Sequence, residues 1–126
     1  MNFTDNYIEM CINNVNIQNL CRHNKGDWFW NGEKPYLYCK SGLGSSNPHD
    51  YKWLPTLEDL FNLLEGKPIE DTWYFYKWIA TENQKFTWVN TDKQSIKELL
   101  LHYVMFDKFN KSWNPEKKEW REINGS

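Results

Sequence analysis

The sequence predicts an α+β fold in which helices pack on one or both faces of antiparallel hairpins, within a single domain that spans residues 1–126. Two aromatic-rich segments, "WFWNGEKPYLY" and "DTWYFYKWIA", have the composition of β-strands. Helical periodicity lies before, between and after them. Because pairs of strands, rather than single strands, alternate with the helices, the sheet is expected to be antiparallel.

Residues 5–21 are expected to form the first helix, with Thr4 or Asp5 as its N-cap. Their apolar residues follow a helical stripe, although the many Asn residues are poor in a helix interior. Residues 27–39 then predict a hairpin, because two aromatic runs flank Asn31-Gly32. Pro35 places the second strand at a sheet edge or marks its first residue.

The segment 41–52, "SGLGSSNPHDYK", has the composition of a loop. The helix predicted next covers 53–66, with Thr56 as N-cap, Asp59 as the acidic member of a capping box and Gly66 after its end.

A second hairpin is predicted from strands 72–80 and 86–91. Read with a period of two, the first of these strands is apolar on both faces. One face would lie on the helices of the domain. The other must be covered by more of this chain, by a second copy or by a ligand.

The longest helix is expected over 92–108, with Thr91 as N-cap and Gln94 in the capping-box position. After it, residues 112–120 predict a turn between two Trp-bearing arms. Pro115 suits the second position of that turn.

Composition excludes some functions. A net charge of −2 and a sequence pI near 5.9 argue against non-specific binding of nucleic acid. The three cysteines have no framework spacing and are expected to be reduced thiols in a cytoplasmic protein. The chain shows no signal peptide pattern, and no apolar run is long enough to predict a membrane span.

Candidate metal and catalytic residues are sparse. Zinc ligands of the right type occur at Cys11, Cys21, His23 and Cys39, but their spacing fits no standard zinc site. His49-Asp50, near two serines, could orient a base, yet "SNPHD" has the composition of a polar turn. His102 is interpreted as a helix-surface or core-edge residue. We therefore expect no enzyme, no metal site and no cofactor.

The aromatic content favours binding. Aromatics make up 17% of the chain, including 8 Trp. Either these rings fill a core that is short of Leu and Val, or they are more ring surface than one core of this size needs and some of them reach an interface. Trp and Tyr are common anchors of interfaces and of stacked bases. The candidate binding residues are Trp78, Trp88, Tyr76, Lys77, Arg22 and Arg121. A homo-oligomer, a dimer or larger, is expected to cover the second aromatic face.

Several stretches carry a resemblance: "YIEMC" followed by "IQNL", then "KGDWFW", "WLPTLEDL" and "LLLHYVMFDKFNKSWNPEKKEW". In these the chain resembles small phage and prophage accessory proteins of low-GC Gram-positive bacteria. Its hairpin-then-helix half is similar to a phage α-β-α sandwich domain. The resemblance implies a phage-encoded protein that acts in the bacterial cytoplasm by binding. One role would be to sequester a nucleotide immune signal, as Thoeris or CBASS sponges do. The alternative is a protein–protein inhibitor of a defence effector, similar to anti-CRISPR proteins, or an assembly factor.

Overall fold

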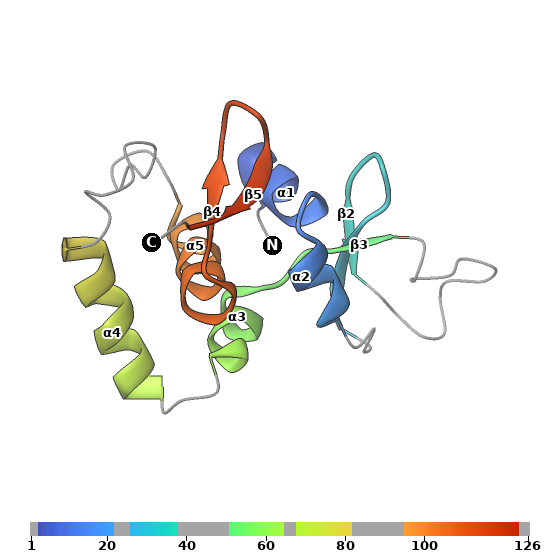
Figure 1. Cartoon of the computed structure of the whole chain (residues 1–126). Coiled ribbons are helices and arrows are strands. Elements are labelled where there is room, and N and C mark those ends of the chain that lie inside the picture. Colours follow the sequence, from blue (N-terminus) through green and yellow to red (C-terminus); the bar gives the residue numbers. More distant parts are fainter. Residues whose placement is uncertain (1–2, 22–25, 38–50, 65–67, 82–94, 124–126) are drawn as a thin grey trace. The chain divides into compact units, whose positions relative to one another are not determined.

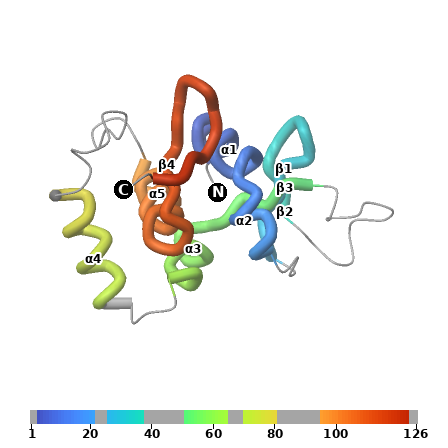
Figure 2. Tube along the Cα trace, viewed as in Figure 1, coloured from blue at the N-terminus to red at the C-terminus, as the bar shows by residue number. Residues whose placement is uncertain are grey.

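The computed structural model describes residues 3–21, 26–37, 51–64, 68–81 and 95–123. Within these ranges the chain forms five helices, one three-stranded sheet and one two-stranded sheet, and both sheets are antiparallel (Figures 1 and 2). The predicted α+β class is thus confirmed. The chain divides into two compact units, which we call the N-terminal unit (residues 1–56) and the C-terminal unit (residues 57–126). The single domain predicted from the sequence, residues 1–126, includes both units.

The N-terminal unit begins with two short helices, α1 (Asp5–Ile12) and α2 (Val15–Asn19). The single helix predicted over 5–21 is therefore wrong. Asn14 divides it, because its side-chain oxygen accepts a hydrogen bond from the backbone N–H of Ile17 at 2.9 Å and so caps α2. Asn side chains compete for backbone groups inside a helix and favour its start.

The start of α1 agrees with the prediction. The Thr4 hydroxyl accepts a hydrogen bond from the backbone N–H of Tyr7 at 3.1 Å. Tyr7 itself is fully buried, and its hydroxyl donates to the carbonyl of Pro55 at 2.7 Å. This bond ties α1 to the end of the unit.

Three short strands form the sheet of this unit: β1 (Trp28–Trp30), β2 (Pro35–Leu37) and β3 (Lys52–Trp53), in the order β2-β1-β3. The hairpin predicted over 27–39 is confirmed for β1 and β2. The loop predicted over 41–52 lies outside the described residues up to position 50, and at Lys52 it is wrong, because β3 begins there.

The turn of the hairpin depends on Asn31. Its side-chain oxygen accepts hydrogen bonds from the backbone N–H groups of Glu33 and Lys34 at 2.8 and 3.0 Å. Gly32 follows with a φ of +101°, which a side chain would strain. Pro35 is the first residue of the edge strand β2, as predicted.

A single side chain fastens α2 to β3. The Gln18 side-chain oxygen accepts from the backbone N–H of Trp53 at 2.7 Å, and its Nε2 donates to the Trp53 carbonyl at 3.0 Å. The same Nε2 donates to the carbonyl of Cys11 at 2.9 Å. Gln18 therefore acts as an additional pairing partner for a strand only two residues long.

The C-terminal unit contains α3 (Leu57–Leu63), α4 (Pro68–Thr81), α5 (Ile96–Phe109), β4 (Lys111–Asn114) and β5 (Glu119–Glu122). α5 is its central element and contacts α3, α4 and β4. The helix predicted over 53–66 begins only at Leu57, directly after Thr56. The expected end at Gly66 lies outside the described residues.

The strand predicted over 72–80 is wrong, because these residues belong to α4. The positions that are buried, Phe75 and Trp78, are three apart, which is a helical spacing. Pro68 at the first position and two acidic residues in the first turn are also helix-start signals. Packing against α5 thus overrides the strand preference of the aromatic residues. The other predicted strand, 86–91, lies outside the described residues.

α5 starts with a capping box, but at a different residue from the one predicted. The Ser95 hydroxyl accepts from the backbone N–H of Glu98 at 3.1 Å, and the Glu98 carboxylate accepts from the N–H of Ser95 at 3.3 Å. This box replaces the predicted pair Thr91 and Gln94, which lies outside the described residues. The helix then runs to Phe109, close to the predicted end at 108.

The predicted turn between two Trp-bearing arms is confirmed over 112–120. β4 and β5 form a hairpin in which Trp113 pairs directly with Trp120, with ring centroids 5.4 Å apart. Pro115 lies in the turn between them. The Trp113 ring is 1% exposed and belongs to the core of this unit.

Candidate functional site: the outward face of helix α4

Helix α4 has two sides of similar aromatic content but opposite exposure. Phe75 and Trp78 are 2% and 3% exposed, whereas Trp73, Tyr74 and Tyr76 are 65%, 55% and 59% exposed. Successive residues turn by about 100° around a helix, so Trp73 and Tyr76 lie on the side opposite the two buried rings. Tyr74, four residues before Trp78, lies at the flank between the two sides. The helix is therefore amphipathic by exposure even though its sequence is aromatic all round.

The buried side of α4 is fixed by rings of α5. Trp78 packs edge-on to His102, with centroids 5.0 Å apart and planes at 89°, and lies 5.6 Å from Tyr103 and 5.9 Å from Phe106. These contacts fix which side of α4 faces α5, because rotating the helix about its axis would expose Trp78.

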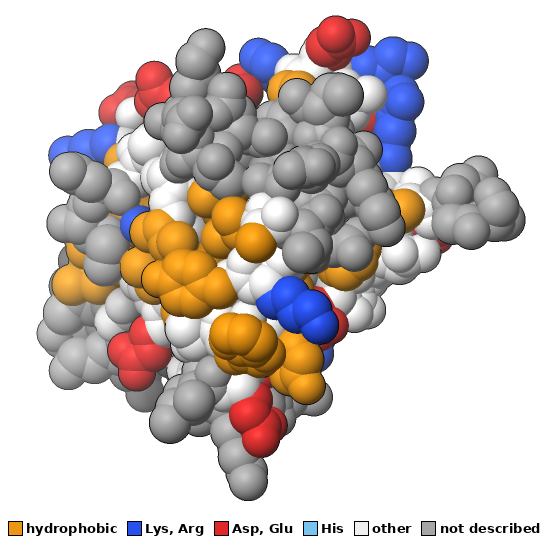
Figure 3. All heavy atoms as spheres, turned by 90° about the vertical axis from the view of Figure 1, so that its left-hand side faces the viewer, with side chains coloured by type: hydrophobic (Ala, Val, Ile, Leu, Met, Phe, Trp, Pro, Cys, Tyr) orange, Lys and Arg blue, Asp and Glu red, His pale blue; other side chains and the backbone are white. Residues whose placement is uncertain are grey.

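The outward side carries the candidate site. We call it the α4 face and define it as Glu70, Trp73, Tyr74, Tyr76 and Lys77, all of which are exposed. Figure 3, turned so that the α4 side of Figure 1 is in front, shows hydrophobic side chains gathered beside basic and acidic ones. Large exposed aromatic side chains that cluster on one element are typical of interaction sites.

The six predicted binding residues do not form one site. Tyr76 and Lys77 lie on the α4 face. Trp78 is buried, so its ring is not presented to a ligand, and the stacking role expected for it does not fit this structure. Trp88 and Arg22 lie outside the described residues.

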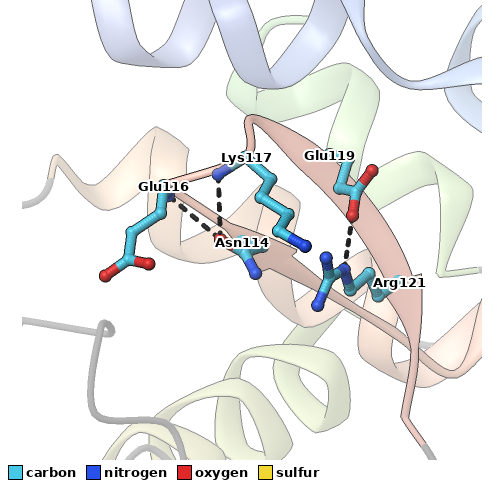
Figure 4. Close-up of polar contacts among 5 residues, drawn as sticks. All are labelled: Asn114, Glu116, Lys117, Glu119 and Arg121. Atoms are coloured by element: carbon cyan, nitrogen blue, oxygen red, sulfur yellow. Dashed lines mark hydrogen bonds and ion pairs between the residues drawn. The ribbon is translucent and has the colours of Figure 1, made fainter.

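Arg121, the last of the six, lies on β5, where its side-chain Nε donates to the Glu119 carboxylate (Figure 4). The neighbouring turn is closed by Asn114, whose side-chain oxygen accepts from the N–H groups of Glu116 and Lys117 at 3.0 and 3.1 Å. Arg121 therefore belongs to a hairpin of mixed charge, where its ion-pair partner is Glu119 of the same strand.

Sequence reasoning missed Trp73 and Tyr74. With a strand period, Trp73 falls on the same face as Phe75. A helical period instead places Trp73 roughly 160° away from Phe75, and it leaves Tyr74, four residues before Trp78, at the flank beside that buried ring. The helix-start signals at Pro68 could have revealed this.

Two titratable groups of α5 are strongly perturbed. Burial lowers the pKa of His102 from 6.5 to about 3, so its imidazole is neutral at physiological pH. Burial, together with the carboxylates of Asp107 and Asp71, raises the pKa of Tyr103 to about 12. Both groups pack against Trp78 beneath α4 and act as parts of the core.

Metal ligands do not gather in the part of the chain that the structure describes, where no group of three or more His, Cys, Asp or Glu side chains could hold an ion. Of the four candidate zinc ligands, Cys11 is buried in α1 and Cys21 is half-buried after α2. His23 and Cys39, like the candidate pair His49-Asp50, lie outside the described residues. None of the described helices has the length and apolar character needed to cross a membrane.

Comparison of the chain with family models, with curated proteins and with solved structures finds no match. The α4 face therefore has to be interpreted from its own chemistry.

Proposed function

We propose that this protein is a non-enzymatic binding protein that docks onto another protein through the α4 face. One observation carries the proposal: three large rings lie exposed on a helix that packs Phe75 and Trp78 into the core. Exposed apolar surface of this kind is covered at a protein interface, where Trp and Tyr supply most of the binding energy.

The chemistry of the face suits a protein partner better than a nucleotide. A helix face is convex, whereas small-molecule sites are concave and enclose most of their ligand. Lys77 is its single cation, and a phosphate-bearing ligand needs several cationic or N–H donors. Nucleotide capture was expected to use Trp78, which is buried.

Only the resemblance to phage accessory proteins supports a biological setting for this binding. In that setting the docking protein is a phage product that acts in the bacterial cytoplasm and blocks or assembles proteins of the host's defence. This narrower role predicts a protein ligand, and it predicts that function is lost when the rings are removed while the fold is retained.

The test is site-specific photocrosslinking in cells that express the chain. A photoreactive phenylalanine analogue replaces Tyr76 on the α4 face or, as control, Glu116 in the exposed turn of the β4–β5 hairpin. We expect discrete protein adducts from position 76 and not from position 116. No adduct from position 76, or the same adducts from both, would contradict the proposal. If micromolar cyclic nucleotides instead raise the melting temperature by several degrees, the nucleotide alternative replaces it.

A further inference from the structure

The residues along one stripe of the α4 face form a pattern whose charges are reversed when it is read from the other end. Glu70, Trp73, Tyr74 and Lys77 occupy positions i, i+3, i+4 and i+7, which is the spacing of a single helix stripe. An acidic residue lies at one end, a basic residue at the other, and two aromatic residues between them. All four are exposed.

Such a stripe is complementary to itself when it runs in the opposite direction. If two α4 helices cross antiparallel about a two-fold axis between Trp73 and Tyr74, each Glu70 lies opposite Lys77 of the partner subunit. Each Trp73 then lies opposite Tyr74 of the partner subunit. A two-fold interface requires this reciprocity, because residue i contacts residue j and j contacts i. A parallel pair would set Glu70 against Glu70 and Lys77 against Lys77, which is repulsive.

We infer that the partner of the α4 face is a second copy of this chain, bound in this antiparallel, two-fold arrangement. The inference rests on the proposed function, since it names the partner of the same surface. It assigns the two charged residues a role in setting the direction of pairing, and the rings the role of burying apolar area.

The area available indicates a dimer of modest affinity. A Trp or Tyr side chain buries roughly 150–250 Å² when fully covered, so the exposed parts of Trp73 and Tyr74 offer on the order of 200–300 Å² per copy. That is about a third of the roughly 800 Å² per partner found in a standard interface. Contacts of Glu70, Lys77 and neighbouring residues add to it. We therefore expect a weak dimer, whose fraction rises with protein concentration.

Charge reversal tests the arrangement without disturbing the core, because both charged side chains are exposed. Sedimentation velocity is recorded from about 1 to 200 µM for the wild type, for Glu70→Lys, for Lys77→Glu and for the double variant that carries both changes. Each single reversal places like charges opposite each other at two symmetry-related sites and should weaken the dimer on the order of tenfold. The double variant exchanges the charges and should restore wild-type association.

A further variant, Trp73→Ala, should reduce association more than either single reversal, while circular dichroism and the melting temperature verify that each variant is folded. Single reversals that leave association unchanged, or a double variant that fails to recover it, overturn the antiparallel pairing. A wild type that is monomeric up to 200 µM overturns the inference as a whole. In that case protein adducts from position 76 at a mass other than that of a dimer still support the proposed function, and their absence removes both.

Discussion

Each of the two units of the chain is stabilised internally by a different kind of contact. In the N-terminal unit, polar side chains reach distant backbone atoms: Gln18 bonds Trp53, 35 residues away, and Tyr7 bonds Pro55, 48 residues away. In the C-terminal unit, rings of α4 and α5 pack on one another, with Trp78 at the centre. Hydrogen bonds fix direction and distance closely, whereas ring contacts tolerate a range of angles. The N-terminal unit should thus be sensitive to single atoms and the C-terminal unit to ring volume.

Removing the central ring tests this difference most severely. Trp78→Ala should lower the free energy of unfolding by about 3–5 kcal/mol, because it deletes a buried ring and leaves a cavity. Denaturation by urea, followed by circular dichroism, measures the loss. Hydrogen exchange should show it first in α4 and α5.

Two matched variants control that experiment. Trp78→Phe keeps a ring and should lose much less, since the Trp78 indole N–H has no hydrogen-bond acceptor among the described residues. Trp73→Ala removes the same side chain from the exposed side of the same helix, so its effect should stay within about 0.5 kcal/mol. An equal loss from Trp73→Ala and Trp78→Ala would mean that the two sides of α4 are assigned incorrectly.

The polar clamp of the N-terminal unit should be the next most sensitive feature. Gln18→Ala removes three hydrogen bonds and leaves the backbone N–H of Trp53 without this acceptor. We expect a loss of about 2–3 kcal/mol in the free energy of unfolding. Hydrogen exchange of residues 51–54 should accelerate strongly.

Asn19→Ala is the matched control, because Asn19 is an exposed amide in the same helix. Its effect should be small. If Gln18→Ala is equally mild, water replaces the clamp without loss, and the contrast between the two units disappears.

The smallest expected effect is a pH dependence of the C-terminal unit. The pKa of His102 is about 3 in the folded chain and 6.5 when exposed, so between these values the unfolded state binds a proton that the folded state does not. Stability is therefore unaffected above pH 6.5 and falls below it, by up to about 1.4 kcal/mol per pH unit. Urea midpoints at pH 7, 6 and 5 should show a decline of about 2 kcal/mol in total.

His102→Leu removes the titrating group from the ring cluster, and the same pH series should then be nearly flat between pH 7 and 5. A variant that retains the full wild-type decline would trace the pH dependence to other groups. In that case His102 would contribute to the free energy of unfolding only through its apolar packing against Trp78 and Trp120.

Sequence reasoning predicted the features that neighbouring residues determine and missed those that distant residues determine. Features set by neighbouring residues were predicted correctly: the Thr4 cap, the Asn31-Gly32 turn with Pro35 at the start of its strand, and the turn between Trp113 and Trp120. Each depends on atoms within a few positions of one another. The capping box of α5 was predicted in kind but at Thr91 rather than Ser95, since both residues precede a suitable side chain three positions later.

What depends on distant atoms was not predicted. The strand β3 exists because Gln18 and β1 pair with it, and two residues carry no periodicity of their own. Of the candidate site, Tyr76 and Lys77 were found, but Trp78 was assigned to the surface and Trp73 and Tyr74 were missed, because "DTWYFYKWIA" satisfies the composition of a strand.

The sequence by itself determined that this chain forms an α+β fold with an excess of aromatic side chains and with defined turns and caps. Those properties follow from local backbone preferences and composition. Only the tertiary structure decided which rings are exposed, because α5 packs against the side of α4 that carries Phe75 and Trp78 and leaves Trp73, Tyr74 and Tyr76 outside. Rings of one type can fill a core or form a binding surface, and the helix that covers them makes the difference.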